Sequence, residues 1–170
     1  MKNSFASVVL MLIFGVSLTF ISVAKADHHE KMDATADQAE MIEFMPSDIV
    51  WGDVPPILPS GAKIVVLEGD PNKPGPYSLR LMMPEGYKIP AHWHKLLERV
   101  TVLSGTLNFG MGDKLDVSQG KKLPAGSFIV IPPNMNHFAW ADEETVIQIN
   151  GDGPFDITYI NPADDPRNKD

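Results

Sequence analysis

Three histidines and one glutamate have the types and spacing of a metal site. One residue separates His92 from His94, Glu98 follows shortly after, and His137 lies far downstream. Side chains two residues apart in a β-strand point to the same side, so His92 and His94 can share one ion. Imidazole and carboxylate donors suit Fe(II), Mn(II), Ni(II), Cu(II) and Zn(II), and their types alone do not choose among these metals. The four residues therefore predict a divalent metal site.

The segments that must position these residues have the composition of short β-strands. Glu98 begins a β-branched run, and His137 follows an apolar stretch that ends in a proline turn. Prolines at 46, 55, 56 and 59 suit short edge strands between 41 and 60. Further strands are predicted over 63–68, 77–83, 99–109, 127–131, 136–141, 145–150 and 155–160. Glycine and proline turns separate them, and no long segment has its apolar residues at helical spacing. This pattern predicts an all-β antiparallel sandwich or barrel.

The segment from Gly86 to Ala141 resembles the cupin family. The first cupin motif, G-x5-H-x-H-x3,4-E-x6-G, is met at Gly86, His92, His94, Glu98 and Gly105. The second, G-x5-P-x-G-x2-H-x3-N, is met at Gly126, Pro132 and His137, with Asn134 in place of glycine and Ala141 in place of asparagine. Asparagine tolerates the left-handed conformation, so we expect Asn134 to preserve the turn.

The resemblance implies a single cupin jelly-roll β-barrel over residues 41–163. It also implies that His92, His94, Glu98 and His137 are the metal ligands. Because cupins often pair, a homodimer is expected from the resemblance alone.

Strand alternation also predicts the surroundings of the metal. If His137 points inward, Met135 and Ala139 share its face, while Phe138 and Trp140 point away. Glu98 likewise places Val100 and Val102 inside. Polar residues near the motifs, Arg80, Gln148 and Asn150, are better explained as exposed strand positions than as site residues. Tyr87 is the candidate catalytic acid or base, because a phenol beside a cation loses its proton more easily.

The first 26 residues have the features of a secretory signal peptide. Lys2 precedes an apolar stretch that ends at Ala24-Lys25-Ala26, and cleavage is expected after Ala26. An uncleaved membrane anchor is the alternative, since about twenty apolar residues can span a bilayer. After cleavage no stable membrane insertion is expected, and the mature protein is expected to be periplasmic or secreted. Residues 27–40 are predicted to be a flexible polar tail, and residues 164–170 an acidic C-terminal tail.

Charge and cysteine content limit the function further. The net charge of −8 argues against nucleic acid as a partner. The absence of cysteine excludes thiolate metal sites such as zinc ribbons and iron–sulfur clusters. Four protein ligands on an octahedral ion leave two positions for a substrate or dioxygen. We therefore favour a metal-dependent enzyme, a dioxygenase-like oxidoreductase acting on a small chelating substrate. The alternative is a non-catalytic protein that binds or senses a small ligand through the metal.

Overall fold

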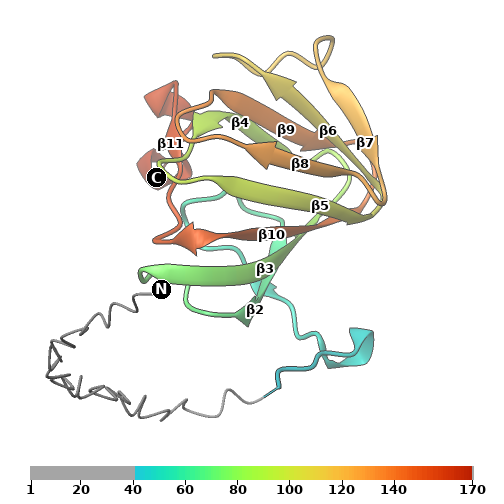
Figure 1. Cartoon of the computed structure of the whole chain (residues 1–170). Coiled ribbons are helices and arrows are strands. Elements are labelled where there is room, and N and C mark those ends of the chain that lie inside the picture. Colours follow the sequence, from blue (N-terminus) through green and yellow to red (C-terminus); the bar gives the residue numbers. More distant parts are fainter. Residues whose placement is uncertain (1–40, 170) are drawn as a thin grey trace, which may run out of the picture. The chain divides into compact units, whose positions relative to one another are not determined.

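The computed structural model describes residues 41–169, in which eleven short strands form two sheets. The predicted signal peptide and the polar tail over 27–40 lie outside the described residues. The large sheet has the strand order β1 (Gly52–Asp53), β2 (Lys63–Glu68), β3 (Gly75–Met83), β10 (Thr145–Gly153), β5 (Glu98–Ser104) and β8 (Phe128–Ile131). The small sheet has the order β11 (Thr158–Tyr159), β4 (Lys88–Trp93), β9 (His137–Ala141), β6 (Thr106–Met111) and β7 (Lys121–Pro124). All neighbouring strands are antiparallel, and the chain passes repeatedly from one sheet to the other, as predicted for a jelly roll (Figure 1).

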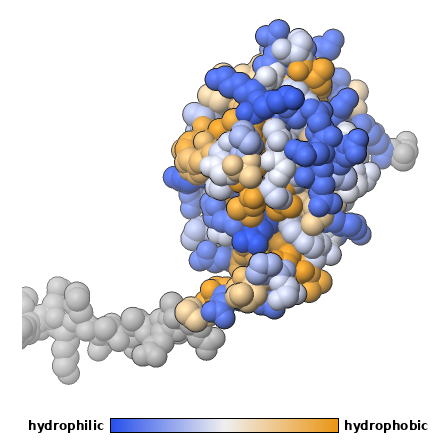
Figure 2. Space-filling model, turned by 90° about the vertical axis from the view of Figure 1, so that its right-hand side faces the viewer, coloured by the Kyte–Doolittle hydropathy of each residue, from blue (hydrophilic) through white to orange (hydrophobic). Residues whose placement is uncertain are grey.

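The core lies between the two sheets because their strands alternate in polarity. On β3, Leu79, Leu81 and Met83 are buried, whereas the residues between them are half-buried. β10 repeats the pattern with Ile147 and Ile149. Each sheet thus presents an apolar face to the other. On the face seen in Figure 2, exposed hydrophobic side chains are scattered among hydrophilic ones.

The chain changes sheets at Gly105, where the sequence pattern predicted one continuous strand over 99–109. That prediction was wrong, because β5 ends at Ser104 in the large sheet and β6 starts at Thr106 in the small one. Gly105 has a φ of +70°, and a Cβ atom there would lie 2.4 Å from the Glu144 carbonyl oxygen. Only glycine fits this corner without strain.

The other elements agree with the predicted pattern to different degrees. The strand predicted over 63–68 is observed with those bounds, whereas β7 was not predicted. Between 41 and 60 the chain forms one 3₁₀ turn, η1 (Pro46–Asp48), and the short β1. At the C-terminal end, η2 (Pro162–Asp164) and η3 (Pro166–Asn168) follow β11, and the Arg167 guanidinium donates to the Ile157 carbonyl at 3.2 Å. Within the described residues, no helix has the length and apolar character needed to cross a membrane.

Candidate metal centre

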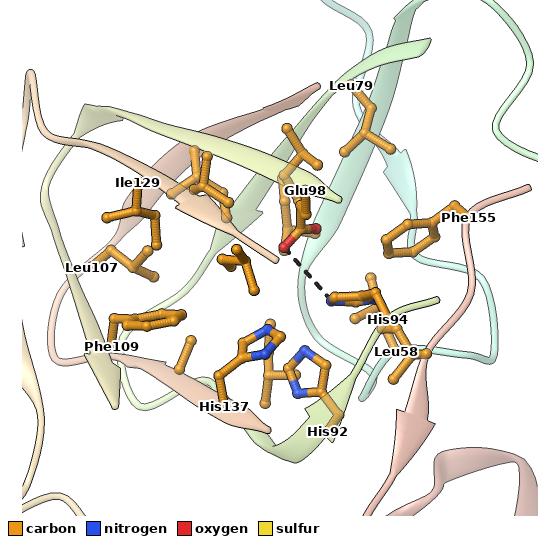
Figure 3. A pocket seen from close by; sticks show the side chains of 18 of the residues that line it. Leu58, Leu79, His92, His94, Glu98, Leu107, Phe109, Ile129, His137 and Phe155 are labelled. Carbon is orange, nitrogen blue, oxygen red and sulfur yellow. Dashed lines mark ion pairs between the residues drawn. The ribbon is translucent and has the colours of Figure 1, made fainter. Parts of the chain in front are cut away.

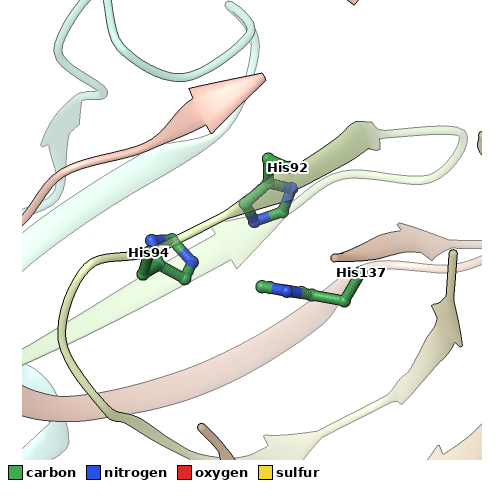
Figure 4. Close-up of side chains that lie close together, drawn as sticks. All are labelled: His92, His94 and His137. Atoms are coloured by element: carbon green, nitrogen blue, oxygen red, sulfur yellow. The ribbon is translucent and has the colours of Figure 1, made fainter. Parts of the chain in front are cut away.

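Three strands bring the four predicted ligands to one cavity between the sheets (Figure 3). His92 on β4 is the register partner of His137 on β9, and His94 follows directly after β4. The donor nitrogens of the three histidines lie within 4.8 Å of one another (Figure 4). Glu98, the first residue of β5, comes from the opposite sheet, and its Oε2 lies 3.6 Å from His94 Nε2.

Backbone carbonyls orient all three imidazoles. Each ring has its Nδ1 within hydrogen-bond distance of a carbonyl oxygen: Pro90 at 2.7 Å for His92, Asp156 at 2.5 Å for His94 and Met135 at 2.8 Å for His137. A carbonyl can only accept, so each Nδ1 carries a proton, and in an uncharged ring the lone pair is then on Nε2. Metal-binding histidines are oriented in this way in proteins. In their uncharged form, the three rings therefore keep their Nε2 lone pairs for a metal.

Burial sets the charge of the site. It lowers the pKa of His92 well below its ordinary value, with a further lowering from the neighbouring histidines, and it lowers the pKa of His137 to about 4. Burial raises the pKa of the Glu98 carboxyl, against the opposing effect of His94. At neutral pH the His92 and His137 rings are therefore uncharged, as metal binding requires. A cation between the four residues would favour the ionised form of Glu98.

The cavity itself is small and apolar. Its volume is about 40 Å³, which is room for a few water molecules. Among its lining residues, all within the described part of the chain, the only polar side chains are those of His92, His94, Glu98 and His137. Phe109 stacks on His137 with the ring centroids 5.4 Å apart, and Phe155 stacks on His94 at 5.6 Å. The donors thus lie among apolar side chains, where electrostatic interactions are strong.

Most side-chain directions predicted around the site are confirmed. Ala139 and Val100 line the cavity, and Val102 is buried in the same core. Phe138 and Trp140 form a separate cluster on the other face of the small sheet. Outside the cavity, Arg80 pairs with Gln148, and Asn150 with Ser78, on the outer face of the large sheet.

The structure does not bring Tyr87 to the metal centre. Its ring is buried in the core without lining the cavity, and its hydroxyl donates to the Pro59 carbonyl at 2.5 Å. Burial raises the pKa of this phenol, so its proton is lost less easily than that of an exposed tyrosine. The prediction that Tyr87 is a catalytic acid or base is therefore corrected. Its hydroxyl anchors the loop that contains Pro59.

The turn before His137 has the conformation predicted for it. Asn134 has a φ of +61°, and its backbone N–H donates to the His94 carbonyl at 2.8 Å. It is the one non-glycine residue with a positive φ among those described. This turn therefore holds the start of β9 against the backbone of His94.

Three residues at the site were not predicted. Phe109 could have been found by alternation, because Leu107 and Phe109 share the inward face of β6. Phe155 and Asp156 give no such signal, since they lie in the loop between β10 and β11. Asp156 holds the loop in two ways, because its carbonyl accepts from His94 and its carboxylate accepts from the Lys95 backbone N–H at 3.2 Å.

Comparisons with known proteins agree on the fold. A family described as a domain of unknown function, DUF4437, matches residues 20–158. The polyketide cyclase RemF from Streptomyces resistomycificus is similar, with a TM-score of 0.63 at 14% identity over 75% of this chain and 90% of the other. An RmlC-like cupin from Shewanella frigidimarina has a TM-score of 0.52 at 18% identity, over 67% of this chain and 91% of the other. No curated protein matches the chain. At these identities the structures confirm the cupin fold and leave the activity open.

Proposed function

The chain belongs to the DUF4437 family and has the cupin fold, and from this premise we propose that it is a metal-dependent enzyme. In this proposal His92, His94, Glu98 and His137 hold one divalent ion. The reaction is of the dioxygenase-like oxidoreductase kind, and the substrate is a small molecule that chelates through oxygen atoms. The ion would supply Lewis acidity and, if it is iron or copper, redox chemistry with dioxygen.

The orientation of the three imidazoles is the observation that supports this proposal. A structural core histidine is satisfied when both ring nitrogens have partners, whereas here each Nδ1 is used by a carbonyl and each Nε2 faces the others. Three such nitrogens beside a buried carboxylate leave lone pairs that a cation would satisfy. The arrangement therefore fits a metal better than it fits a packed core.

The remaining lining residues suit a reaction that must exclude water. Aliphatic and aromatic side chains surround the donors, so the part of a substrate that reaches them would lose its water. The donors come from both sheets and from three strands, so their positions are fixed by the barrel. This rigidity is what a preorganised site requires.

Elemental analysis of the mature protein, purified from its native compartment without chelator, tests the proposal. We expect one equivalent of iron, manganese, nickel or copper, which the His92→Ala/His137→Ala variant should lose. The matched control is His28→Ala/His29→Ala, which removes the two histidines of the sequence that are not proposed ligands. This variant should retain the metal. Equal metal content in the two double variants would refute the site. Oxygen consumption with chelating acids, enediols and catechols then tests the reaction.

A non-catalytic role is the second candidate, and one observation favours it. Within the described residues, the cavity has no titratable side chain besides the four proposed ligands. A protein that binds or senses a small ligand through the metal needs no further acid or base. Zinc or no metal in the elemental analysis would favour this candidate. Detection of product from a bound ligand would exclude it.

Export is also part of the proposal. The sequence of residues 1–26 supports cleavage after Ala26 and a periplasmic or secreted location. Intact mass of the protein from the native cell measures this directly, because a mature chain should begin at Asp27. A retained leader would instead support the membrane anchor.

A further inference from the structure

The metal cavity is too small for a substrate, but a larger groove shares one of its walls. The cavity holds about 40 Å³, whereas pockets for small organic ligands hold roughly 300–1,000 Å³. The groove holds about 430 Å³. A different hollow on the His94 side of the cavity holds only about 10 Å³. By volume, the groove is the better place for the body of a substrate.

The groove arises where the two sheets separate. β7 is an edge strand of the small sheet, and β8 is an edge strand of the large sheet. A tight turn joins them, in which the Ser127 N–H donates to the Pro124 carbonyl at 3.0 Å. Beyond this turn the two strands belong to different sheets and diverge (Figure 1). We call the space between them the β7–β8 groove, and its apolar lining includes Phe109, Met111, Leu123, Ile129, Ile131 and Met135.

Three side chains separate the β7–β8 groove from the metal centre. Phe109, Ile129 and Ile131 line both the groove and the cavity. In Figure 3, Phe109 and Ile129 lie on the side of the cavity opposite Phe155. Phe109 and Ile129 are only partly buried, and Phe109 stacks on His137. Phe109 and Ile129 are therefore the two partly buried side chains of the shared wall.

The polar residues of the groove indicate the charge of its ligand. Lys121 is the one charged residue that lines the groove within the described part of the chain, and Gln119 lies beside it. The side chain of Lys121 is on the face of β7 shared with Leu123, whereas Lys122 is outside the groove. An apolar groove with a single cation complements an organic anion with an aromatic or branched aliphatic body.

We propose that the β7–β8 groove binds the apolar body of such an organic anion, with its charge beside Lys121 and its other end at the histidines. This inference rests on the proposed function, because it assigns the substrate class of that same site. The groove then supplies the volume and the charge recognition that the metal cavity lacks. Phe109 and Ile129 become the residues that determine the size of ligand that reaches the metal.

A binding experiment with 1-anilinonaphthalene-8-sulfonate, an aromatic anion, tests the groove. We expect saturable fluorescence enhancement in the full mature protein. Lys121→Glu should weaken binding at least tenfold, whereas Lys122→Glu should leave it within twofold. The two variants carry the same change of charge on neighbouring residues of β7, so only a local contact separates them. Equal weakening in both variants, or no saturable binding by the wild type, would overturn the proposal.

The same probe tests the link to the metal centre without any metal. Because Phe109 stacks on His137, a probe in the groove should shift the imidazole NMR signals of His137. Unchanged signals at saturation would overturn the connection between groove and cavity. The four proposed ligands do not line the groove, and binding of the probe is measured without metal. Failure of the metal site therefore leaves the groove measurement intact.

Discussion

Acidification of the metal-free protein should reveal how much stability depends on keeping His137 uncharged. Burial lowers the pKa of His137 from the ordinary 6.5 to about 4 in the folded protein. As the pH falls below 6.5, the unfolded chain takes up a proton on this residue and the folded protein does not. The unfolded state is therefore favoured increasingly until the pH reaches the folded pKa. The stability that goes with an uncharged His137 is fully present above pH 6.5 and is lost as the pH falls to about 4.

The size of the loss follows from the difference between the two pKa values. At about 1.4 kcal/mol for each pKa unit, the His137 contribution is about 3 kcal/mol. This is a large part of the roughly 5–15 kcal/mol by which small domains are stable. His92, whose pKa is also lowered, adds to the loss. Glu98 acts in the opposite direction, because a carboxyl with a raised pKa stabilises the folded state at low pH and loses that effect as the pH rises.

Urea unfolding followed by tryptophan fluorescence, with EDTA present, measures the effect at about pH 7.5 and about pH 4. The comparison protein is His137→Gln, which keeps His92 and Glu98 but has no titrating group at 137. Between the two pH values, the free energy of unfolding of the wild type should fall by about 3 kcal/mol more than that of His137→Gln. If both proteins lose the same stability on acidification, His137 is not held uncharged in the folded state and the reasoning is refuted.

Three further outcomes are expected. Asp156→Ala removes the carboxylate that accepts from the Lys95 N–H, so the Asp156 carbonyl that orients His94 loses its support. Metal affinity, measured by competition titration with a chelator, should therefore fall about tenfold. Unchanged affinity would contradict this role of Asp156. Tyr87→Phe removes the bond to Pro59 and should lower the free energy of unfolding by about 1 kcal/mol, while a loss of metal would restore Tyr87 to the site. Gly105→Ala should lower the free energy of unfolding by more than about 2 kcal/mol, because the strain of the positive φ and the contact with Glu144 add. Gly126 has a φ of +88° and open space around it, so Gly126→Ala should lower the free energy of unfolding by about 1–2 kcal/mol. Equal losses in the two variants would argue against the close contact at Gly105.

The sequence was informative where the residue type itself limits the backbone or the chemistry. Period-two alternation placed Ala139 and Val100 on the inner face and Phe138 and Trp140 on the outer face, because successive side chains of a strand point to opposite sides. The order of histidines and glutamate predicted which residues meet in the cavity. Asn134 was expected in a left-handed turn from its residue type, and it has that conformation.

Local patterns could not show where the chain changes sheets. The residues from 99 to 109 have strand composition throughout, and the corner at Gly105 depends on its close contact with Glu144 and Thr145, which are distant in sequence. Tyr87 was misassigned for the same reason. Its neighbours in sequence are the metal motif, but its neighbour in space is the loop at Pro59.

The sequence by itself determined the strand-rich fold, the apolar interior and the four residues that converge on it, because alternation and motif spacing are properties of the chain alone. Only the tertiary structure decided the state of the site. The carbonyl of Asp156 orients His94 from the loop between β10 and β11, burial between two sheets keeps His92 and His137 uncharged, and the separation of β7 from β8 opens a groove beside them. These properties depend on distances between segments that are far apart in sequence, and such distances are fixed only when the two sheets pack together.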